Sequence, residues 1–90
     1  GAISQDFPPY PEYALSRGWQ DQLVVRYLIG KDGRVKEVTV IEPPERSEFT
    51  RVALSTIRHW RFHPFRDEKG EPKEVMHELT VQFKIARRHS

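Results

Sequence analysis

The sequence predicts an α+β domain of two layers, in which two helices pack on one face of a three-stranded antiparallel sheet, in the order α-β-β-α-β. Three observations lead to this prediction. The hairpin signal Lys31-Asp32-Gly33 separates two segments rich in β-branched residues. Residues 47–60 repeat apolar side chains at helical spacing, and residues 74–85 alternate apolar and polar side chains.

The chain is long enough for one domain, which we place at residues 10–86 of the 90. Residues 1–9 are expected to be the end of a linker or a cloning remnant, and residues 87–90 a basic tail. No run approaches the roughly 18 apolar residues of a membrane-spanning helix. The chain has no cysteine, which excludes disulfides and thiolate chemistry. A net charge of +2 with interspersed signs gives little support for nucleic-acid binding.

The first half of the chain is predicted to form a short helix and a β-hairpin. Three prolines between residues 7 and 11 favour an extended entry, Pro11 suits the first turn of a helix, and Gly18 ends that helix. Residues 23–29 form a strand, and residues 35–41 return antiparallel to it. In the returning strand, regular alternation places Val38 and Val40 on one face, with Val35 and Ile41 on the other.

The second helix is predicted to begin at Ser47, which is a good N-cap, and to end before Pro64. Its apolar stripe consists of Phe49, Val52, Ala53, Ile57 and Trp60. We expect Trp60 to fill the space between the helix and the sheet, and Phe62 to anchor the turn that follows. Trp19 lies outside any stripe, so it is either a lid on the sheet or an exposed contact.

The last strand, residues 74–85, is the feature most relevant to function. At about 3.3 Å per residue it would extend close to 40 Å, so we expect it to overhang its partners. If this strand lies at the edge of the sheet, its unpaired backbone can accept an extended peptide by strand addition. Pairing of the same edge with a second copy of the chain is the alternative.

The sequence predicts no catalytic site, metal site or cofactor, and the chain is not expected to be an enzyme. His59 and His63 are four residues apart, but Pro64 disfavours helical geometry at His63 and no third ligand is near. No serine occupies a turn beside a base. Trp60 and Phe62 beside basic residues allow stacking on nucleic-acid bases, although a core role explains them better.

A series of short motifs over residues 10–85 resembles the C-terminal domain of TonB-type energy transducers. These motifs are Tyr10-Pro11, Ala14, Gly18, Asp32-Gly33-Arg34-Val35, Ala53 and Trp60-Arg61-Phe62-His63-Pro64. Each motif is weak alone, but their order over this length is specific. One position departs from the family pattern, because Asp21 stands where the family has the second glycine of a Gly-x-x-Gly motif.

The resemblance implies a periplasmic domain at the end of an inner-membrane-anchored protein. Such a domain binds the TonB box of outer-membrane receptors by strand addition and couples proton motive force to uptake of iron-siderophores or similar nutrients. Membrane partners resembling ExbB and ExbD would act through an N-terminal part not contained in this sequence. A homodimer is possible, and nucleic acid is not an expected partner.

The resemblance also suggests which residues bind the partner and which maintain the fold. The expected partner-binding residues are Tyr10, Pro11, Val75, His77, Leu79, Thr80, Val81, Gln82, Phe83 and Lys84. The expected structural residues are Gly18, Asp32, Gly33, Trp60, Arg61, Phe62 and Pro64. Two alternatives remain at this point: a TolA-like periplasmic interaction domain and, with less support, a small nucleic-acid-binding module.

Overall fold

The computed structural model describes residues 1–86, so the predicted basic tail at residues 87–90 lies outside the described part of the chain. The elements follow in the order β1 (Ala2–Ser4), α1 (Glu12–Ser16), β2 (Asp21–Ile29), β3 (Val35–Glu42), α2 (Ser47–Ile57), β4 (Arg61–Phe62), β5 (Phe65–Arg66), β6 (Pro72–Lys73) and β7 (Val75–Phe83). No helix of the described region is both long enough and apolar enough to traverse a bilayer.

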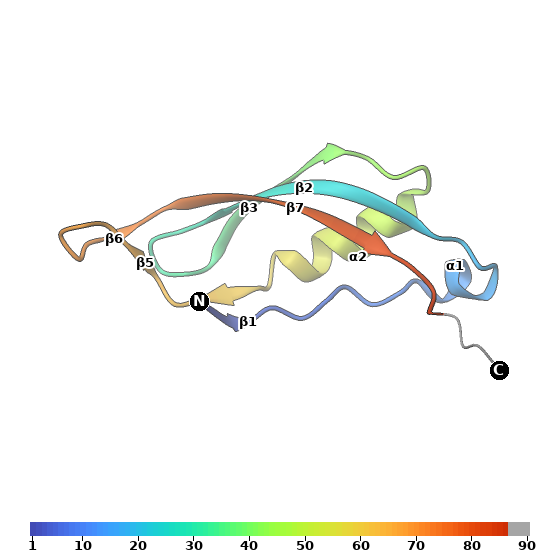
Figure 1. The fold of residues 1–90 in the computed structure, drawn as a ribbon, viewed down its shortest axis with the longest axis horizontal. Helices are drawn as coiled ribbons and strands as arrows, with labels where there is room; N and C mark the ends of the chain where they lie inside the picture. The colour runs from blue at the N-terminus through green and yellow to red at the C-terminus, as the bar shows by residue number, and fades with distance from the viewer. Residues whose placement is uncertain (87–90) are drawn as a thin grey trace.

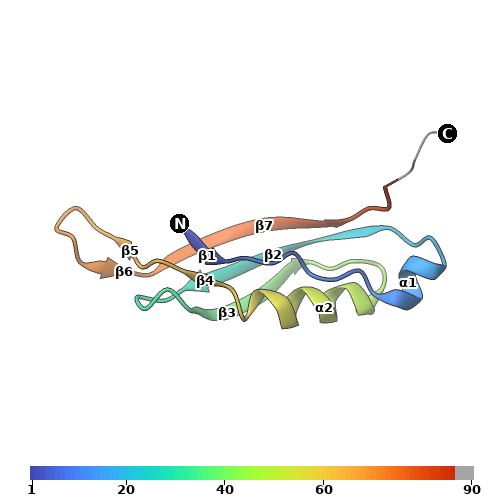
Figure 2. The ribbon, with the colours of Figure 1, turned by 90° about the horizontal axis from the view of Figure 1, so that it is seen from below.

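The predicted α+β architecture is confirmed. The main sheet has three antiparallel strands in the order β3-β2-β7, and two small two-stranded pairs, β1-β4 and β5-β6, lie outside it. The molecule is elongated, and the strands run along its long axis (Figure 1). Figure 2 shows α2, the N-terminal segment and α1 on one side of the sheet. The other face of the sheet is left open to solvent.

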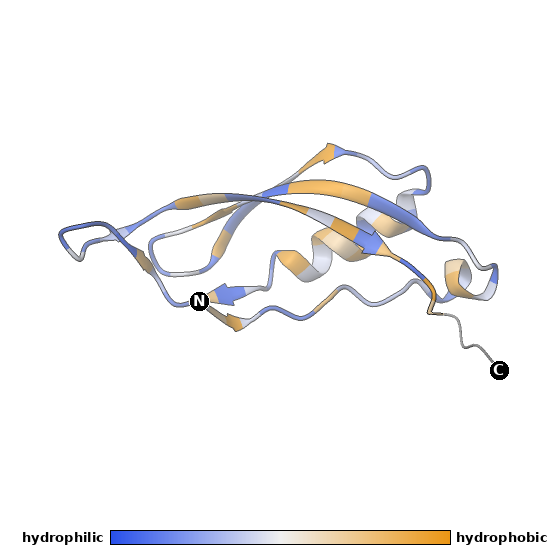
Figure 3. Cartoon of the chain, in the orientation of Figure 1, coloured by the Kyte–Doolittle hydropathy of each residue, from blue (hydrophilic) through white to orange (hydrophobic). Residues whose placement is uncertain are grey.

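The core lies between the sheet and the elements that cover it. Strand β2 is the centre of this layer, because its alternate side chains Leu23, Val25, Tyr27 and Ile29 are all buried. From α2 the buried side chains are Phe49, Ala53 and Ile57. Figure 3 shows hydrophobic residues along β2 and α2, and the burial of alternate β2 residues and of one stripe of α2 agrees with the periods of two and 3.6 that predicted them.

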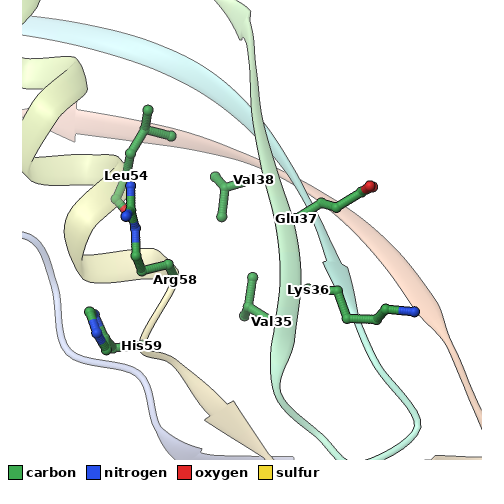
Figure 4. Close-up of a pocket in the computed structure, with 7 residues that line it drawn as sticks. All are labelled: Val35, Lys36, Glu37, Val38, Leu54, Arg58 and His59. Carbon is green, nitrogen blue, oxygen red and sulfur yellow. The ribbon is translucent and has the colours of Figure 1, made fainter.

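Strand β3 departs from the predicted alternation. Its pairing with β2 shifts register between Leu28 and Ile29, where one extra residue is inserted in β3. Val35 therefore lies on the same face as Val38, and both side chains point toward α2 (Figure 4). The expectation that Val35 and Val38 face opposite sides is wrong, because regular alternation does not continue through a β-bulge.

Helix α2 also differs from the prediction at both ends. Its N-cap residue is Arg46 rather than Ser47, and no side chain caps it. The helix ends at Ile57, and two tight turns follow, in which the His59 and Trp60 N–H groups donate to the Thr56 and Ile57 carbonyls. Trp60 is nevertheless buried and packs edge to face on Tyr27, so its predicted role between helix and sheet is confirmed.

The N-terminal segment, which the sequence suggested as a linker end or a remnant, lies along the covered face of the sheet. Strand β1 pairs with β4, and the His63 N–H donates to the Gly1 carbonyl at 2.9 Å. The Trp60 indole Nε1–H donates to the Asp6 carbonyl at 2.7 Å. These contacts fix residues 1–6 beside the Trp60-Phe62 region, where no sequence period predicted a strand.

Candidate functional site

Strand β7 forms one edge of the main sheet. It pairs with β2 over nine consecutive positions, from Asp21 opposite Phe83 to Ile29 opposite Val75, without a bulge. Both strands therefore have the same extent, and the predicted overhang of β7 is wrong. Among the described residues no strand pairs with the other side of β7. The unpaired backbone groups consequently lie along the length of β7 rather than beyond its end.

The direction of the β7 backbone groups follows from the hairpin between β2 and β3. The Gly30 N–H donates to the Arg34 carbonyl at 2.7 Å, so the peptide groups of Gly30 face β3. Peptide groups alternate in direction along a strand. The backbone N–H and C=O groups of the odd-numbered β2 residues therefore point toward β7 and form hydrogen bonds with their odd-numbered partners. The even-numbered residues of β7 present their N–H and C=O groups to the free edge: Met76, Glu78, Thr80 and Gln82.

The side chains of the odd-numbered β7 residues face the core. Val81 and Phe83 are about 99% buried, while Val75, His77 and Leu79 are half-buried. His77 lies between the rings of Tyr27 and Phe65, with ring centroids 5.6 and 5.8 Å away. The predicted partner-binding residues Val81 and Phe83 therefore have their side chains in the core.

The even-numbered side chains lie on the open face of the sheet and tie β7 to β2. The Arg26 guanidinium pairs with the Glu78 carboxylate at 2.8 Å, and the Gln82 amide donates to the Gln22 carbonyl oxygen at 3.2 Å. Thr80, between them, is exposed and has no such side-chain bond among the described residues. These cross-strand pairs keep β7 regular while its edge stays unpaired.

Both ends of β7 are held by side-chain contacts. At its start, the Lys36 ammonium lies 2.6 Å from the Glu74 carboxylate, and this hydrogen bond raises the pKa of Lys36. After its end, the Ile85 N–H donates to the Gln20 side-chain oxygen at 2.7 Å. Lys84, another predicted partner-binding residue, is exposed between these contacts. The edge is therefore a fixed template before any partner arrives.

Tyr10 lies at the end of β7 where Phe83 is buried. Its ring packs edge to face on Phe83 at 5.6 Å and on Phe49 at 5.9 Å, and its hydroxyl donates to the Trp19 carbonyl. Burial, and to a lesser extent the charge of Asp21, raises the pKa of the Tyr10 phenol. The structure thus brings Tyr10 next to β7, whereas Pro11 precedes α1 as its N-cap residue.

The loop beside α1 contains residues that sequence reasoning did not assign. Trp19 is half-buried and packs against the core, and the guanidinium groups of Arg46 and Arg17 lie 3.4 and 5.7 Å from its ring centroid. This side chain therefore serves as a lid. Asp21 accepts hydrogen bonds from the Glu45 and Arg46 N–H groups at 3.0 and 3.3 Å. A carboxylate at the family's glycine position therefore holds the segment that enters α2.

The predicted structural residues gather at the other end of the sheet. Gly33 has φ +82°, and a Cβ there would lie 1.9 Å from the Phe62 carbonyl oxygen. The Phe62 N–H donates to the Gly33 carbonyl, and Asp32 accepts from the Arg34 N–H. Arg61 pairs with Arg34 in an isolated bridge, and Pro64 follows it. Gly18, at φ +70°, ends α1 at the opposite end of the molecule.

Comparison with known proteins agrees with this geometry. Residues 7–85 match the family described as the Gram-negative bacterial TonB protein C-terminal. Protein TonB of Yersinia enterocolitica is 39% identical over 84 residues, covering 93% of this chain and 30% of that protein. Protein TonB of Escherichia coli K12 is 29% identical over 84 residues, covering 93% of this chain and 35% of that protein. The chain thus spans about a third of these relatives.

A solution structure of the Pseudomonas aeruginosa TonB C-terminal domain is also similar. Its TM-score is 0.85 at 29% sequence identity, and the match covers 99% of this chain and 89% of that one. The fold, the order of the motifs and the extent of the sequence match therefore agree, and the chain belongs to the Gram-negative bacterial TonB C-terminal family.

Proposed function

We propose that this domain is the periplasmic receptor-binding part of a TonB-type energy transducer and that β7 binds the TonB box of outer-membrane receptors by strand addition. The observation that supports this most directly is the uninterrupted edge of β7, whose even-numbered peptide groups face away from β2. An extended segment laid along this edge would bond up to four residues of β7. Such binding requires no catalytic group and no cofactor.

Specificity in this proposal comes from side chains beside the edge. A strand added to β7 places alternate side chains on the two faces of the sheet. On the covered face, the side chains of the added strand would meet half-buried Val75, His77 and Leu79. On the open face, they would meet exposed Met76 and Thr80. Tyr10 lies at the end of this track, beside Phe83, and Pro11 follows it as the N-cap residue of α1. They would meet the part of the ligand that runs past the strand.

The larger protein would supply the rest of the mechanism. Inner-membrane partners of the ExbB and ExbD type would act on a preceding anchor, and the grip on the TonB box would carry proton motive force to the receptor for uptake of iron-siderophores or similar nutrients. Force along an added strand loads several backbone hydrogen bonds at once. A modest interface would therefore hold before it releases.

The test compares two substitutions at the centre of the exposed edge. Thr80→Pro removes an outward N–H and places the proline ring in the path of the added strand, whereas Thr80→Val keeps the backbone donor. We expect Thr80→Pro to weaken binding of a TonB-box peptide at least tenfold in calorimetry, and Thr80→Val to leave it within about twofold. Circular dichroism should be near native for both variants.

Two results would contradict the proposal. Unimpaired peptide binding by a folded Thr80→Pro variant would show that the edge is not the docking site. Sedimentation that reveals a stable dimer, with no peptide binding, would show that a second copy of the chain occupies β7. In an NMR titration of the unchanged protein, amides of residues 75–83 should shift before those of α2.

A further inference from the structure

Three arginines surround a small hollow at the end of the molecule that holds the β2–β3 hairpin. The hollow has a volume of about 140 Å³ and is lined by Arg34, Val35, Arg58, His59, Trp60 and Arg61. No carboxylate lines it. Arg34 belongs to the hairpin, Arg58 follows α2, and Arg61 begins β4, so the fold itself brings these charges together.

The fold brings these three arginines together although their like charges repel one another. Arg34 and Arg61 are direct antiparallel partners in an isolated bridge, and like charges in such positions destabilise a pair. The ion pair of Arg34 with Asp32 is long, at 3.8 Å. Among residues 1–86, no carboxylate forms an ion pair with Arg58 or Arg61. Asp32 is therefore the one carboxylate that pairs with this cluster among the described residues, and it leaves Arg58 and Arg61 without a counter-charge.

The surrounding backbone keeps the hollow rigid. The Arg58 Nε–H donates to the Leu54 carbonyl at 3.2 Å, which leaves its terminal nitrogens available. His59 Nδ1–H donates to the Ser55 carbonyl at 2.8 Å. The carbonyl groups at the end of α2 are thereby occupied, and their partial negative charge is compensated by these two side chains. Arg61, which lines the same hollow, is exposed.

We propose that this cluster, Arg34, Arg58 and Arg61, is a binding site for a phosphate group. Guanidinium groups match phosphate oxygens with paired N–H donors, and three of them suit a tetrahedral phosphate group better than a single planar carboxylate. The adjoining hollow, about 410 Å³, shares Val35, Arg58 and His59 and adds apolar Val38 and Leu54 (Figure 4). Lys36 and Glu37 also line it, but their side chains point away from α2 and Arg58 (Figure 4). The hollow has room for the organic part of a phosphate ester, either a free ester or a lipid headgroup.

The first experiment is an NMR titration with inorganic phosphate at constant ionic strength, with sodium chloride as the balancing salt. Amides of residues 33–35 and 58–62 should shift and reach saturation. Arg61→Gln and Arg58→Gln should each weaken binding about tenfold, whereas Arg51→Gln, exposed on α2 and outside the hollow, should bind phosphate unchanged. Acetate should bind much more weakly than phosphate.

A stability measurement separates binding from misfolding. Without phosphate, Arg61→Gln removes a like-charge contact, so its thermal midpoint should equal or exceed that of the unchanged protein. With phosphate, only the unchanged protein and Arg51→Gln should gain stability. The proposal fails if no saturable shift occurs, if acetate acts as strongly as phosphate, or if Arg61→Gln responds like the unchanged protein.

Vesicles then identify the source of the phosphate. Co-sedimentation with phosphatidylglycerol vesicles, absent with phosphatidylcholine alone and lost in Arg61→Gln, would assign the site to anionic lipid headgroups. Saturable phosphate binding without vesicle binding would assign it to soluble phosphate esters. This site lies apart from the β7 edge, so Thr80→Pro should leave phosphate binding intact, and the two proposals can fail separately.

Discussion

The two edges of the sheet differ in regularity. Strand β7 pairs with β2 at nine successive positions, while β3 on the other side of β2 shifts register twice over a similar length. Bulges are a common means of blunting an exposed edge, because they twist the strand and interrupt the row of donors and acceptors. One edge is thus suited to receive a foreign strand, and the other is not.

The cover of the two strands differs as well. Strand β3 lies beside α2, and its Val35 and Val38 line a hollow between strand and helix. Strand β7 has the N-terminal segment near its covered face, where Phe7 packs against Phe83 at 5.8 Å while staying 62% exposed. Val81 and Phe83 of β7 are nevertheless buried, whereas no side chain of β3 is, so the edge without bulges is also the one packed more deeply on the core.

The largest effect on stability is expected for a proline at an odd-numbered position of β7, where the backbone N–H faces β2. Val81→Pro removes an N–H that faces β2 and truncates a buried side chain, so we expect a loss of about 4 kcal/mol in the free energy of unfolding. Thr80→Pro, one residue away with an outward N–H, should lose about 1 kcal/mol or less. Urea denaturation of both variants measures the difference; equal losses would contradict the assigned direction of the peptide groups.

A second variant tests the close approach of the turn between β2 and β3 to the backbone of Phe62. Gly33→Ala should cost about 3 kcal/mol or more, because its Cβ would overlap the Phe62 carbonyl oxygen. Gly70→Ala is the matched control, since Gly70 has the same φ of +82° with nothing within 4 Å. It should cost only the backbone strain, about 1 kcal/mol. Similar thermal midpoints for the two variants would exclude the close approach of Gly33 to Phe62.

The loop that leads from β3 into α2 offers a third test. Asp21→Gly restores the family's residue but removes the acceptor for two backbone N–H groups, so we expect a loss of about 1–2 kcal/mol. Asp21→Asn keeps one side-chain oxygen and should lose less. Hydrogen exchange at Glu45 and Arg46 should accelerate in the glycine variant; unchanged exchange at both amides would contradict the role of Asp21.

The smallest expected effect is a pH dependence of stability that compares Tyr27 on β2 with Lys36 on β3. Burial raises the pKa of Tyr27, and the bond to Glu74 raises the pKa of Lys36. A raised folded pKa stabilises the native state below the unfolded value, and that stability is lost as the pH rises through the folded pKa. Stability should therefore fall above about pH 10.

Two substitutions separate these groups. Tyr27→Phe should flatten the decline of the urea midpoint between about pH 9 and 11, since no phenol remains to ionise at that position. Lys36→Gln should have a weaker effect, because Lys36 is exposed and its ion pair is screened by solvent. An unchanged decline in Tyr27→Phe would exclude this phenol as a source of the pH dependence.

The sequence predicted those parts of the fold that are set by short-range chemistry. The alternation of β7, the stripe of α2 and the glycine turn at Gly33 all depend on neighbouring residues, and the structure confirms them. The length and alternation of residues 74–85 indicated this strand as the candidate site, and the family resemblance implied the same strand. The individual partner-binding residues stay a prediction, although the structure shows that Val81 and Phe83 point inward.

Features that depend on distant partners could not be predicted in the same way. The bulge that turns Val35 inward is visible only once β3 is paired with β2. The outward direction of the Met76 and Glu78 peptide groups requires knowledge of the ladder, so these residues were missed. Single contacts, such as the hydrogen bond from the Trp60 indole to the Asp6 carbonyl, hold the N-terminal segment in place. Its sequence therefore shows no hydrophobic period from which a strand could be predicted.

The short pairing of β1 with β4 has a mechanical consequence. A pull on the chain ahead of Tyr10 meets this pair of strands, with two registered positions, before it reaches the three-stranded sheet. Once detached, the nine residues before Tyr10 can extend to roughly 30 Å. Tension applied to this end of the domain would therefore first extend the N-terminal segment, before it strained the three-stranded sheet.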